Sequence, residues 1–309
     1  MGDPAGVGPE IIVKALSDPQ IRAVIQPLVF GDQALLSQTA SRLGLSSEFE
    51  VRQVGALDPS GLTPGAFSEA SGRASMAYLA AAADSLEAGE AEALVTGPIH
   101  KKALWLCGQK GPGQTEWLEQ RFRAPRVVMM LCGPRLKVVL ATTHLALREV
   151  PRALTRESLS ATVKLAESEL CSYFYPRGPR LALAALNPHG EDGGLPGREE
   201  QEVLVPVVCE LRAQGLSVEG PLPGDTVFAL AVQGRFDAVV ALYHDQGLAP
   251  LKALCFAEGV NVTLGLPIIR TSPDHGVAYD IAGQGVADPT SLKQAIQMAV
   301  GMAGTREGA

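Results

Sequence analysis

A buried strand is indicated by Ala238-Val239-Val240-Ala241-Leu242, an unbroken apolar run that leads directly into Tyr243-His244-Asp245. Such a run, without alternating polar residues, is typical of a strand covered on both faces of a parallel sheet. Similar runs occur at 28–30, 91–95, 127–131, 136–140 and 181–186. Amphipathic helix patterns lie between them, at 68–86, 157–173 and 199–213. Because strands and helices alternate, the sequence predicts an α/β fold built on parallel strands.

The length of the chain favours two domains. The chain has 309 residues, and a domain typically has about 100–200. The Pro- and Gly-rich stretches at 57–66, 108–113 and 187–197 are short enough to be loops inside domains rather than linkers. A chain that leaves one domain and later returns to it is therefore as plausible as two consecutive domains.

The composition argues against several classes of function. The net charge is −7 and aromatic residues make up 5% of the chain, which disfavours a nucleic-acid partner. No apolar run reaches the ~18 residues of a membrane-spanning helix, so we expect no membrane partner. The five cysteines form no C-x-x-C pair and no secretory signal is visible, so we expect reduced thiols and a cytoplasmic location. Acidic small molecules remain as ligands, through local cationic pockets.

Three of the five histidines follow apolar strand candidates. His144, His189 and His244 each come a few residues after such a run. Ligands of open α/β sheets bind beyond the carboxyl ends of the strands. Three imidazoles there could hold a divalent metal such as zinc, with one coordination position open. The alternative is three unrelated loop histidines, and the sequence favours neither.

Two aspartates are candidates for acid–base chemistry beside these histidines. Asp245 follows His244 directly, and Asp225 lies in a Pro- and Gly-rich turn. Either could orient a metal ligand, join the metal or act as a base. Asp225 would also serve as the N-cap of a helix that begins at Thr226, and for this residue alone the sequence favours the cap.

Four cations are candidates for binding an anionic ligand. Lys101 and Lys102 follow shortly after Thr96-Gly97-Pro98, while Lys252 and Arg270 are expected in loops near apolar runs. Lysine and arginine hold phosphate or carboxylate groups through charge-assisted hydrogen bonds. Taken singly, each of them is better explained as a solvated surface cation.

The glycines near the start do not form a standard dinucleotide fingerprint. The segment Gly2-Asp3-Pro4-Ala5-Gly6-Val7-Gly8-Pro9-Glu10 lacks the G-x-G-x-x-G spacing. Its glycines permit tight turns, and Pro9 with Glu10 suits the first turn of a helix. The junction is either an anion site or a plain helix start.

Taken together, these motifs resemble one family, the 4-hydroxythreonine-4-phosphate dehydrogenases of pyridoxal phosphate biosynthesis. The matching stretches occur in the family's order over nearly the whole chain. They are residues 2–10, Thr96-Gly97-Pro98, 141–147, Leu186-Asn187-Pro188-His189, Gly220-Pro221-Leu222-Pro223, Tyr243-His244-Asp245-Gln246-Gly247-Leu248 and 259–276.

The resemblance implies an isopropylmalate dehydrogenase-like fold with two α/β subdomains and a cleft between them. We expect residues 1–112 and 261–309 to form the first subdomain. Residues 113–260 would form the second, with the metal site and the dimer interface. The resemblance also implies a homodimer whose active sites use residues from both subunits.

The resemblance further assigns roles to individual residues. His144, His189 and His244 match the family's metal ligands, and zinc is the expected metal, with magnesium or cobalt as alternatives. The family also uses NAD. The expected substrate contacts are Gln114, Thr115, Lys252, Asn261 and Arg270. The expected NAD contacts are Asn187, Gly193, Gly194, Asp274 and His275.

The implied reaction is oxidation of 4-phosphooxy-L-threonine at C3, followed by loss of CO2 to give 3-amino-2-oxopropyl phosphate. The metal would lower the pKa of the C3 hydroxyl, and Asp245 or Asp225 would take its proton. Hydride would pass to the nicotinamide. Lys252 and Arg270 would hold the anionic groups and so fix the substrate against the cofactor.

Three departures from the family pattern bear on these expectations. Gln114 stands where the family usually has histidine in Gly-His-Thr-Glu, so the substrate could be another phosphorylated hydroxy acid such as a phospho-threonate. The loop after His189 carries an added carboxylate, Asp192. Only Met1 precedes the motif at 2–10, where the family has a strand, so we expect a sheet lacking one strand.

The rival hypothesis from another class of function is a binding protein that has lost catalysis.

Overall fold

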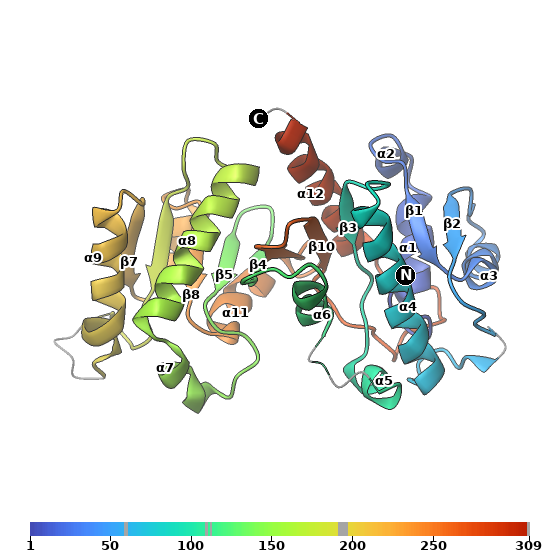
Figure 1. Ribbon diagram of the computed structural model, residues 1–309, viewed down its shortest axis with the longest axis horizontal. Helices are drawn as coiled ribbons and strands as arrows, with labels where there is room; N and C mark the ends of the chain where they lie inside the picture. The colour runs from blue at the N-terminus through green and yellow to red at the C-terminus, as the bar shows by residue number, and fades with distance from the viewer. Residues whose placement is uncertain (59–60, 109–110, 112, 191–196, 308–309) are drawn as a thin grey trace. The chain divides into compact units, whose positions relative to one another are not determined.

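The computed structural model describes the chain except at 59–60, 109–110, 112, 191–196 and 308–309. It divides into two compact units, each of α/β type (Figure 1). The first unit comprises Met1–Pro125 and Leu266–Gly304, and the second comprises Arg126–Gly265 with Thr305–Ala309. The chain thus leaves the first unit and returns to it, which is one of the two arrangements that the sequence left open.

Both boundaries fall later in the chain than 112/113 and 260/261, where the sequence suggested them. Helix α6 (Gln114–Arg121) belongs to the first unit because Arg121 binds Asp84 and Glu87 of α4 at 2.7–2.8 Å. Strand β9 (Val260–Leu264) stays with the second unit because it pairs along its whole length with β4.

In the second unit the strands follow the order β9-β4-β5-β8-β6-β7. Strands β5, β8, β6 and β7 run parallel to one another. The parallel strands expected at 136–140, 181–186 and 238–242 are thereby confirmed. The bounds are β4 (Val128–Cys132), β5 (Lys137–Leu140), β6 (Leu181–Ala184), β7 (Val218–Leu222) and β8 (Ala238–Ala241).

Strand β4 differs from the expected parallel arrangement, because it runs antiparallel to both β5 and β9. The reason is the short connection to β5, closed by a hydrogen bond from Gly133 N to Leu136 O at 2.8 Å. A tight turn of this kind reverses the chain, whereas a parallel connection requires a long crossover.

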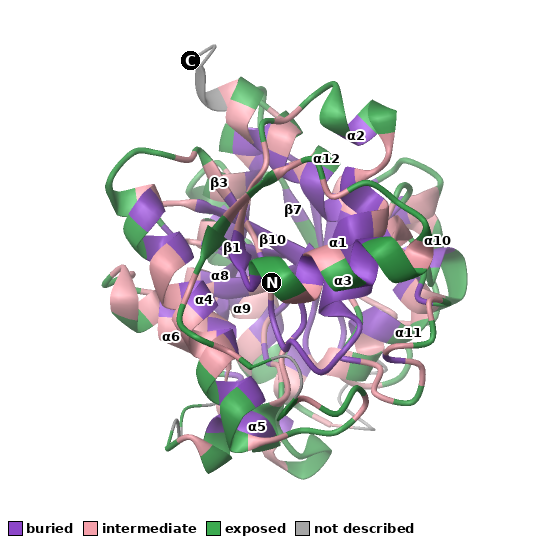
Figure 2. Ribbon diagram, turned by 90° about the vertical axis from the view of Figure 1, so that its right-hand side faces the viewer, coloured by how far each residue is buried: buried purple, intermediate pink, exposed green. Residues whose placement is uncertain are grey.

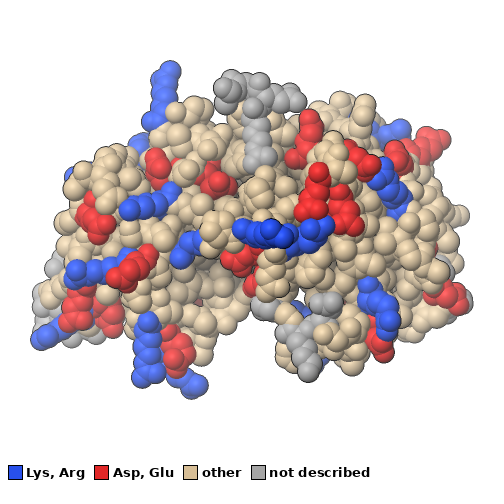
Figure 3. Space-filling model, viewed as in Figure 1, with Lys and Arg blue, Asp and Glu red and all other residues tan. Residues whose placement is uncertain are grey.

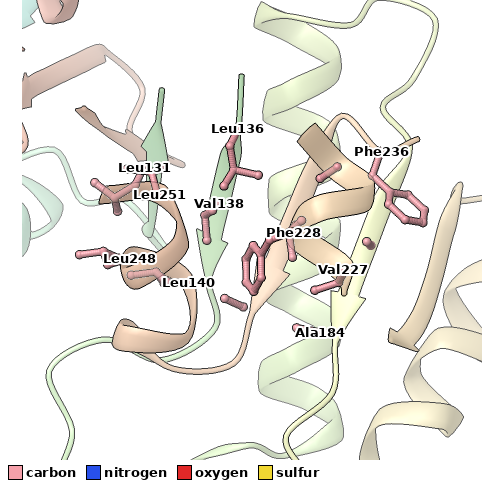
Figure 4. Packing of buried hydrophobic residues seen from close by; sticks show 14 of the residues in the cluster. Leu131, Leu136, Val138, Leu140, Ala184, Val227, Phe228, Phe236, Leu248 and Leu251 are labelled. Atoms are coloured by element: carbon pink, nitrogen blue, oxygen red, sulfur yellow. The ribbon is translucent and has the colours of Figure 1, made fainter. Parts of the chain in front are cut away.

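Helices cover both faces of this sheet. Figure 4 shows Val138 and Leu140 of β5 packed beside Leu248 of α11, with Val227 and Phe228 of α10 on the same face. Helix α8 packs on the opposite face (Figures 1 and 4). The bounds are α7 (Val150–Ala153), α8 (Arg156–Tyr173), α9 (Val205–Ala213), α10 (Val227–Val232) and α11 (His244–Cys255), with a 3₁₀ turn η2 (Leu147–Glu149) and a π-helical turn η3 (Glu200–Leu204).

The first unit contains two parallel strand pairs, β1 with β2 and β3 with β10. Its long helix α4 begins after Ser68, whose hydroxyl caps Ser71 N, as the helix pattern at 68–86 predicts. The bounds are α1 (Gly8–Leu16), α2 (Pro19–Arg22), β1 (Leu28–Gly31), α3 (Gln33–Leu43), β2 (Glu50–Gln53), α4 (Glu69–Glu87), β3 (Ala93–Val95), α5 (Lys101–Leu106), β10 (Ile269–Pro273) and α12 (Thr290–Glu307).

The glycine-rich start of the chain is buried throughout residues 2–10 (Figure 2). A Cβ on Gly2 would lie 2.5 Å from Pro98 O, and one on Gly97 would lie 2.3 Å from Met1 O. These two glycines therefore allow two backbone segments to touch. The amides of Ala5 and Val7 bond to Asp3 Oδ1 and Val277 O. The structure thus favours the plain helix start over the anion site.

The surface carries charges of both signs. Basic and acidic side chains are interspersed over the face drawn in Figure 3, in a chain with 26 basic and 33 acidic residues. Among the described helices, none has both the length and the apolar character that crossing a membrane requires.

Candidate active site

The three candidate metal ligands of the second unit follow three neighbouring parallel strands. Because β5, β8 and β6 are adjacent and parallel, their carboxyl ends lie at the same edge of the sheet. His144 lies in the loop after β5, His244 begins α11 after β8, and His189 lies in the loop after β6. The ring centroids of His144 and His244 are 5.7 Å apart. His189 is exposed and has a left-handed backbone, with φ of 63°.

A carboxylate orients one of these rings. His244 Nδ1 lies 2.7 Å from Asp245 Oδ1, which leaves Nε2 on the other side of the ring. Metal-binding histidines commonly use their second nitrogen in this way, so the donor chemistry fits zinc. Within the described ranges, no group of three or more His, Cys, Asp or Glu side chains is arranged to hold a metal. The three-histidine site therefore stays a prediction.

The loop that carries His189 is held by a buried acid that the sequence did not single out. Glu200 is 2% exposed, and its Oε1 accepts from the backbone amides of Leu186 and Asn187 at 2.9 and 2.8 Å. Asn187 Nδ2 donates to Glu200 Oε2 and to Glu199 Oε2, both at 2.8 Å. The predicted NAD contact Asn187 thus already uses its amide donor within the protein. Gly193 and Gly194, also predicted for NAD, lie outside the described residues.

The two candidate bases are both exposed. Asp245 lies in the first turn of α11, and Asp225 lies in the turn before α10. The N-cap predicted for Asp225 is wrong. The cap residue of α10 is Thr226, without a side-chain cap, and its hydroxyl donates to Pro223 O at 3.2 Å. Because residues 223–226 form a tight turn, α10 begins at Val227, one residue later than expected.

In the first unit, Arg270 and Gln114 form a buried polar cluster with Thr96. Arg270 is 3% exposed, and its Nη2 donates to Thr96 Oγ1 at 2.8 Å and to Gln114 Oε1 at 3.0 Å. Gln114 Nε2 in turn donates to Gly97 O at 3.2 Å. Burial lowers the pKa of Arg270 to about 10, which the charge of Glu116 opposes, so the guanidinium stays cationic at neutral pH. The sequence missed Thr96 as a site residue, although its Thr-Gly-Pro motif was a visible signal.

Arg270 and Lys252 do not lie in loops, as the sequence suggested. Arg270 is on β10, and Lys252 is on the last turn of α11 with its Nζ 5.3 Å from the Phe256 ring centre. Helix α11 is not predicted from the sequence, because Gly247 and Pro250 interrupt its helical pattern.

The remaining predicted contacts are divided between the units. Asn261 is half-buried on β9 of the second unit. Thr115 is half-buried in the first turn of α6, in the first unit. Asp274 follows β10, where its amide donates to Ser291 Oγ at 3.0 Å, and His275 next to it is exposed. The structure thus brings Arg270 together with Gln114, and His144 with His244 and Asp245.

Comparison with known sequences finds one family. A model of the family described as "Pyridoxal phosphate biosynthetic protein PdxA" matches residues 23–299. A 4-hydroxythreonine-4-phosphate dehydrogenase from Geobacter metallireducens is 45% identical over 319 residues, covering 98% of this chain and 94% of the relative. A relative from Oceanobacillus iheyensis, provisionally named a D-threonate 4-phosphate dehydrogenase, is 38% identical and covers 99% of this chain and 97% of its own length.

Solved structures agree with this result. The 4-hydroxythreonine-4-phosphate dehydrogenase from Klebsiella pneumoniae has a TM-score of 0.87 and 38% identity, covering 98% of this chain and 96% of that one. Isocitrate dehydrogenase from Methylococcus capsulatus, at 17% identity and a TM-score of 0.50, covers 99% and 83% and is similar in fold alone. The α/β, isopropylmalate dehydrogenase-like fold expected from the sequence is confirmed. The chain therefore belongs to the PdxA family of pyridoxal phosphate biosynthetic proteins.

Proposed function

We propose that this chain is a metal- and NAD-dependent dehydrogenase that oxidises 4-phosphooxy-L-threonine at C3. The β-keto acid formed would lose CO2 and give 3-amino-2-oxopropyl phosphate. The observation that carries the proposal is the placement of His144, His189 and His244 after three neighbouring parallel strands, in a chain similar to dehydrogenases of this name.

The histidines would hold a divalent metal, most simply zinc. When bound there, such a metal acidifies a substrate hydroxyl and stabilises negative charge on oxygen. Asp245, hydrogen-bonded to His244, orients that imidazole. Asp245 or Asp225 would accept the hydroxyl proton, since both carboxylates are exposed near the carboxyl ends of the strands.

The anionic groups of the substrate would be bound by two cationic side chains. The Arg270 guanidinium would bind phosphate or carboxylate, and Gln114 and Thr96 hold it in place. Lys252 would neutralise the second anionic group, while Thr115 and Asn261 would donate hydrogen bonds. NAD would contact Asp274, His275 and the segment from Asn187 to Gly194. We also propose that the protein acts as a homodimer with shared active sites.

A second candidate keeps the reaction and changes the substrate. Gln114 can donate a hydrogen bond but cannot become cationic as histidine can, so it favours a different set of anionic groups. The relative named for D-threonate 4-phosphate shows that one chain 38% identical to this one carries another substrate name. A phospho-threonate has a hydroxyl in place of the amino group and is the matched competitor.

Steady-state NADH formation tests both candidates. The panel contains 4-phosphooxy-L-threonine, D- and L-threonate 4-phosphate and unphosphorylated 4-hydroxy-L-threonine, each with NAD and added zinc, cobalt or magnesium. We expect the highest kcat/KM with 4-phosphooxy-L-threonine and little turnover without phosphate. A clear preference for a threonate phosphate would replace the leading substrate.

Metal analysis tests the catalytic class itself. We expect about one metal per chain in the wild type and loss of that metal in His189→Ala. Wild-type protein that carries no stoichiometric metal and shows no turnover with any added metal would support a binding protein instead.

A further inference from the structure

Side chains join the ends of the three strands that precede the histidines, beyond the point where the backbone ladders stop. The last paired residues are Leu140 with Ala241, and Leu183 with Val240. One backbone bond follows on the β5 side, from Ala141 N to Ala241 O at 2.8 Å. Further along the chain, the connections are made by Thr142 and Gln246.

These two side chains hold the backbone of Leu242 at both of its polar atoms. Thr142 Oγ1 donates to Leu242 O at 2.7 Å. Gln246 Oε1 accepts from Leu242 N at 2.7 Å, and its Nε2 donates to Ala185 O at 2.6 Å. The side-chain amide of Gln246 faces one donor, Leu242 N, and one acceptor, Ala185 O. Only one of its two orientations therefore satisfies both. The bonds run continuously from the end of β5 through β8 to β6.

The tied positions lie immediately before the histidines. Thr142 precedes His144 by two residues, and Leu242 precedes His244 by two. Ala185 lies four residues before His189. Thr142 is 9% exposed, while Leu242 and Ala185 are buried almost completely, so water competes little for these bonds.

We propose that Gln246 and Thr142 are positioning residues that set the spacing of His144, His189 and His244. This inference rests on the proposed function, because that function assigns the metal to these histidines. Neither side chain binds the metal itself. Each restrains the backbone at the end of a strand. A shift of the backbone at that point would move the histidine that follows. Partners that hydrogen-bond a metal ligand directly typically change metal affinity by about 10–100-fold when they are lost, and this sets the scale expected for residues that act on the ligands through the backbone.

Four variants test the proposal. Gln246→Met and Thr142→Val keep the size of each side chain and remove its hydrogen bonds. Thr142→Ser restores the hydroxyl. Gln284→Met is the matched control, because Gln284 Nε2 donates to a backbone oxygen, Asp280 O at 2.7 Å, on the surface of the first unit.

The measurements are zinc and cobalt affinity, the visible spectrum of the cobalt-loaded protein, kcat, KM and the melting temperature. For Gln246→Met and Thr142→Val we expect metal affinity to fall by about 10-fold or more, with an altered cobalt spectrum. We expect kcat to fall more than the KM of the phosphorylated substrate changes. Thr142→Ser and Gln284→Met should behave like the wild type.

Three outcomes separate the possibilities. If both bond-deleting variants bind metal within twofold of the wild type, with an unchanged cobalt spectrum, the positioning role is overturned. A lower melting temperature with unchanged metal affinity would likewise reduce these residues to structural ones. If the wild type itself binds no metal, the proposed function fails, and this inference fails with it.

Discussion

The buried Arg270 guanidinium is held in place by two neutral side chains. Its charge stays in the core of the first unit, with Thr96 and Gln114 accepting from Nη2. Both partners are neutral, so they orient the cation without cancelling it. A carboxylate in place of either would cancel the positive charge that the proposed binding of a substrate phosphate requires.

Replacement of Gln114 by Glu should therefore weaken substrate binding. The new carboxylate would pair with Arg270, and an anionic substrate would have to displace it. We expect KM for the phosphorylated substrate to rise by about 10-fold or more, which is the usual contribution of one charge-assisted hydrogen bond. Steady-state kinetics measure this.

Gln120→Glu is the control, since it makes the same change on the exposed side of the same helix, α6. An unchanged KM in Gln114→Glu would show that Arg270 does not bind the substrate anion.

A pH-dependent contribution to stability is expected at Asp237. Arg180 donates two side-chain hydrogen bonds to this carboxylate and so lowers its pKa below the ordinary 3.8. Because the folded-state pKa is depressed, the stabilisation is complete above pH 3.8 and is lost as the pH falls through the lowered value.

Asp237→Asn should accordingly unfold at lower urea concentration than the wild type at pH 7. The difference should shrink steadily as the pH is lowered below 3.8. Denaturation curves at several pH values check this, and a difference that stays constant down to acid pH would contradict it.

At the scale of elements, α11 lies unusually close to the sheet. A Cβ on Gly247 would lie 2.5 Å from Val138 Cγ1, 3.0 Å from Leu140 Cδ2 and 3.1 Å from Ala241 Cβ. The glycine therefore sets the distance between β5 and the helix that carries His244 and Gln246.

Gly247→Ala should destabilise the protein by about 1–3 kcal/mol, because the core must move to admit the methyl group. Activity should fall as well, since His244 moves with the helix. Gly301→Ala in α12 is the control: apart from its own helix backbone and its chain neighbours, an added Cβ there meets no described atom within 4 Å, and alanine should stabilise the helix by up to about 1 kcal/mol. Urea unfolding of both variants decides, and equal effects would contradict this account of the packing.

Elements whose apolar residues follow one clear helical or strand spacing could be predicted from the sequence. Helices α4 and α8 begin within a residue or so of the patterns at 68–86 and 157–173, because Ser68 and Thr155 form capping boxes. Helix α11 and strand β7 could not, since Gly and Pro inside them break the local pattern and tertiary packing restores it. The same holds within the candidate site: the histidine positions were visible, whereas the burial of Glu200 depends on a loop that folds back onto it.

At the scale of the whole molecule, metal binding should be visible as global stabilisation. A ligand that binds only the folded state at 100 times its Kd adds about 2.7 kcal/mol. We expect zinc or cobalt to raise the melting temperature of the chelator-treated wild type and to have little effect on His244→Ala. Differential scanning calorimetry measures both, and an equal rise in the variant would place the metal elsewhere.

The division of the chain into two units bears on how the substrate preference could change. The cluster of Arg270, Thr96 and Gln114 lies wholly in the first unit, whereas the bonds of Thr142 and Gln246 lie wholly in the second. The two sets share no residue and no hydrogen bond. Under the proposed function, substitutions in the first unit could therefore change the preferred anion while the three histidines of the second unit are kept, so that a new substrate would be reached in small steps.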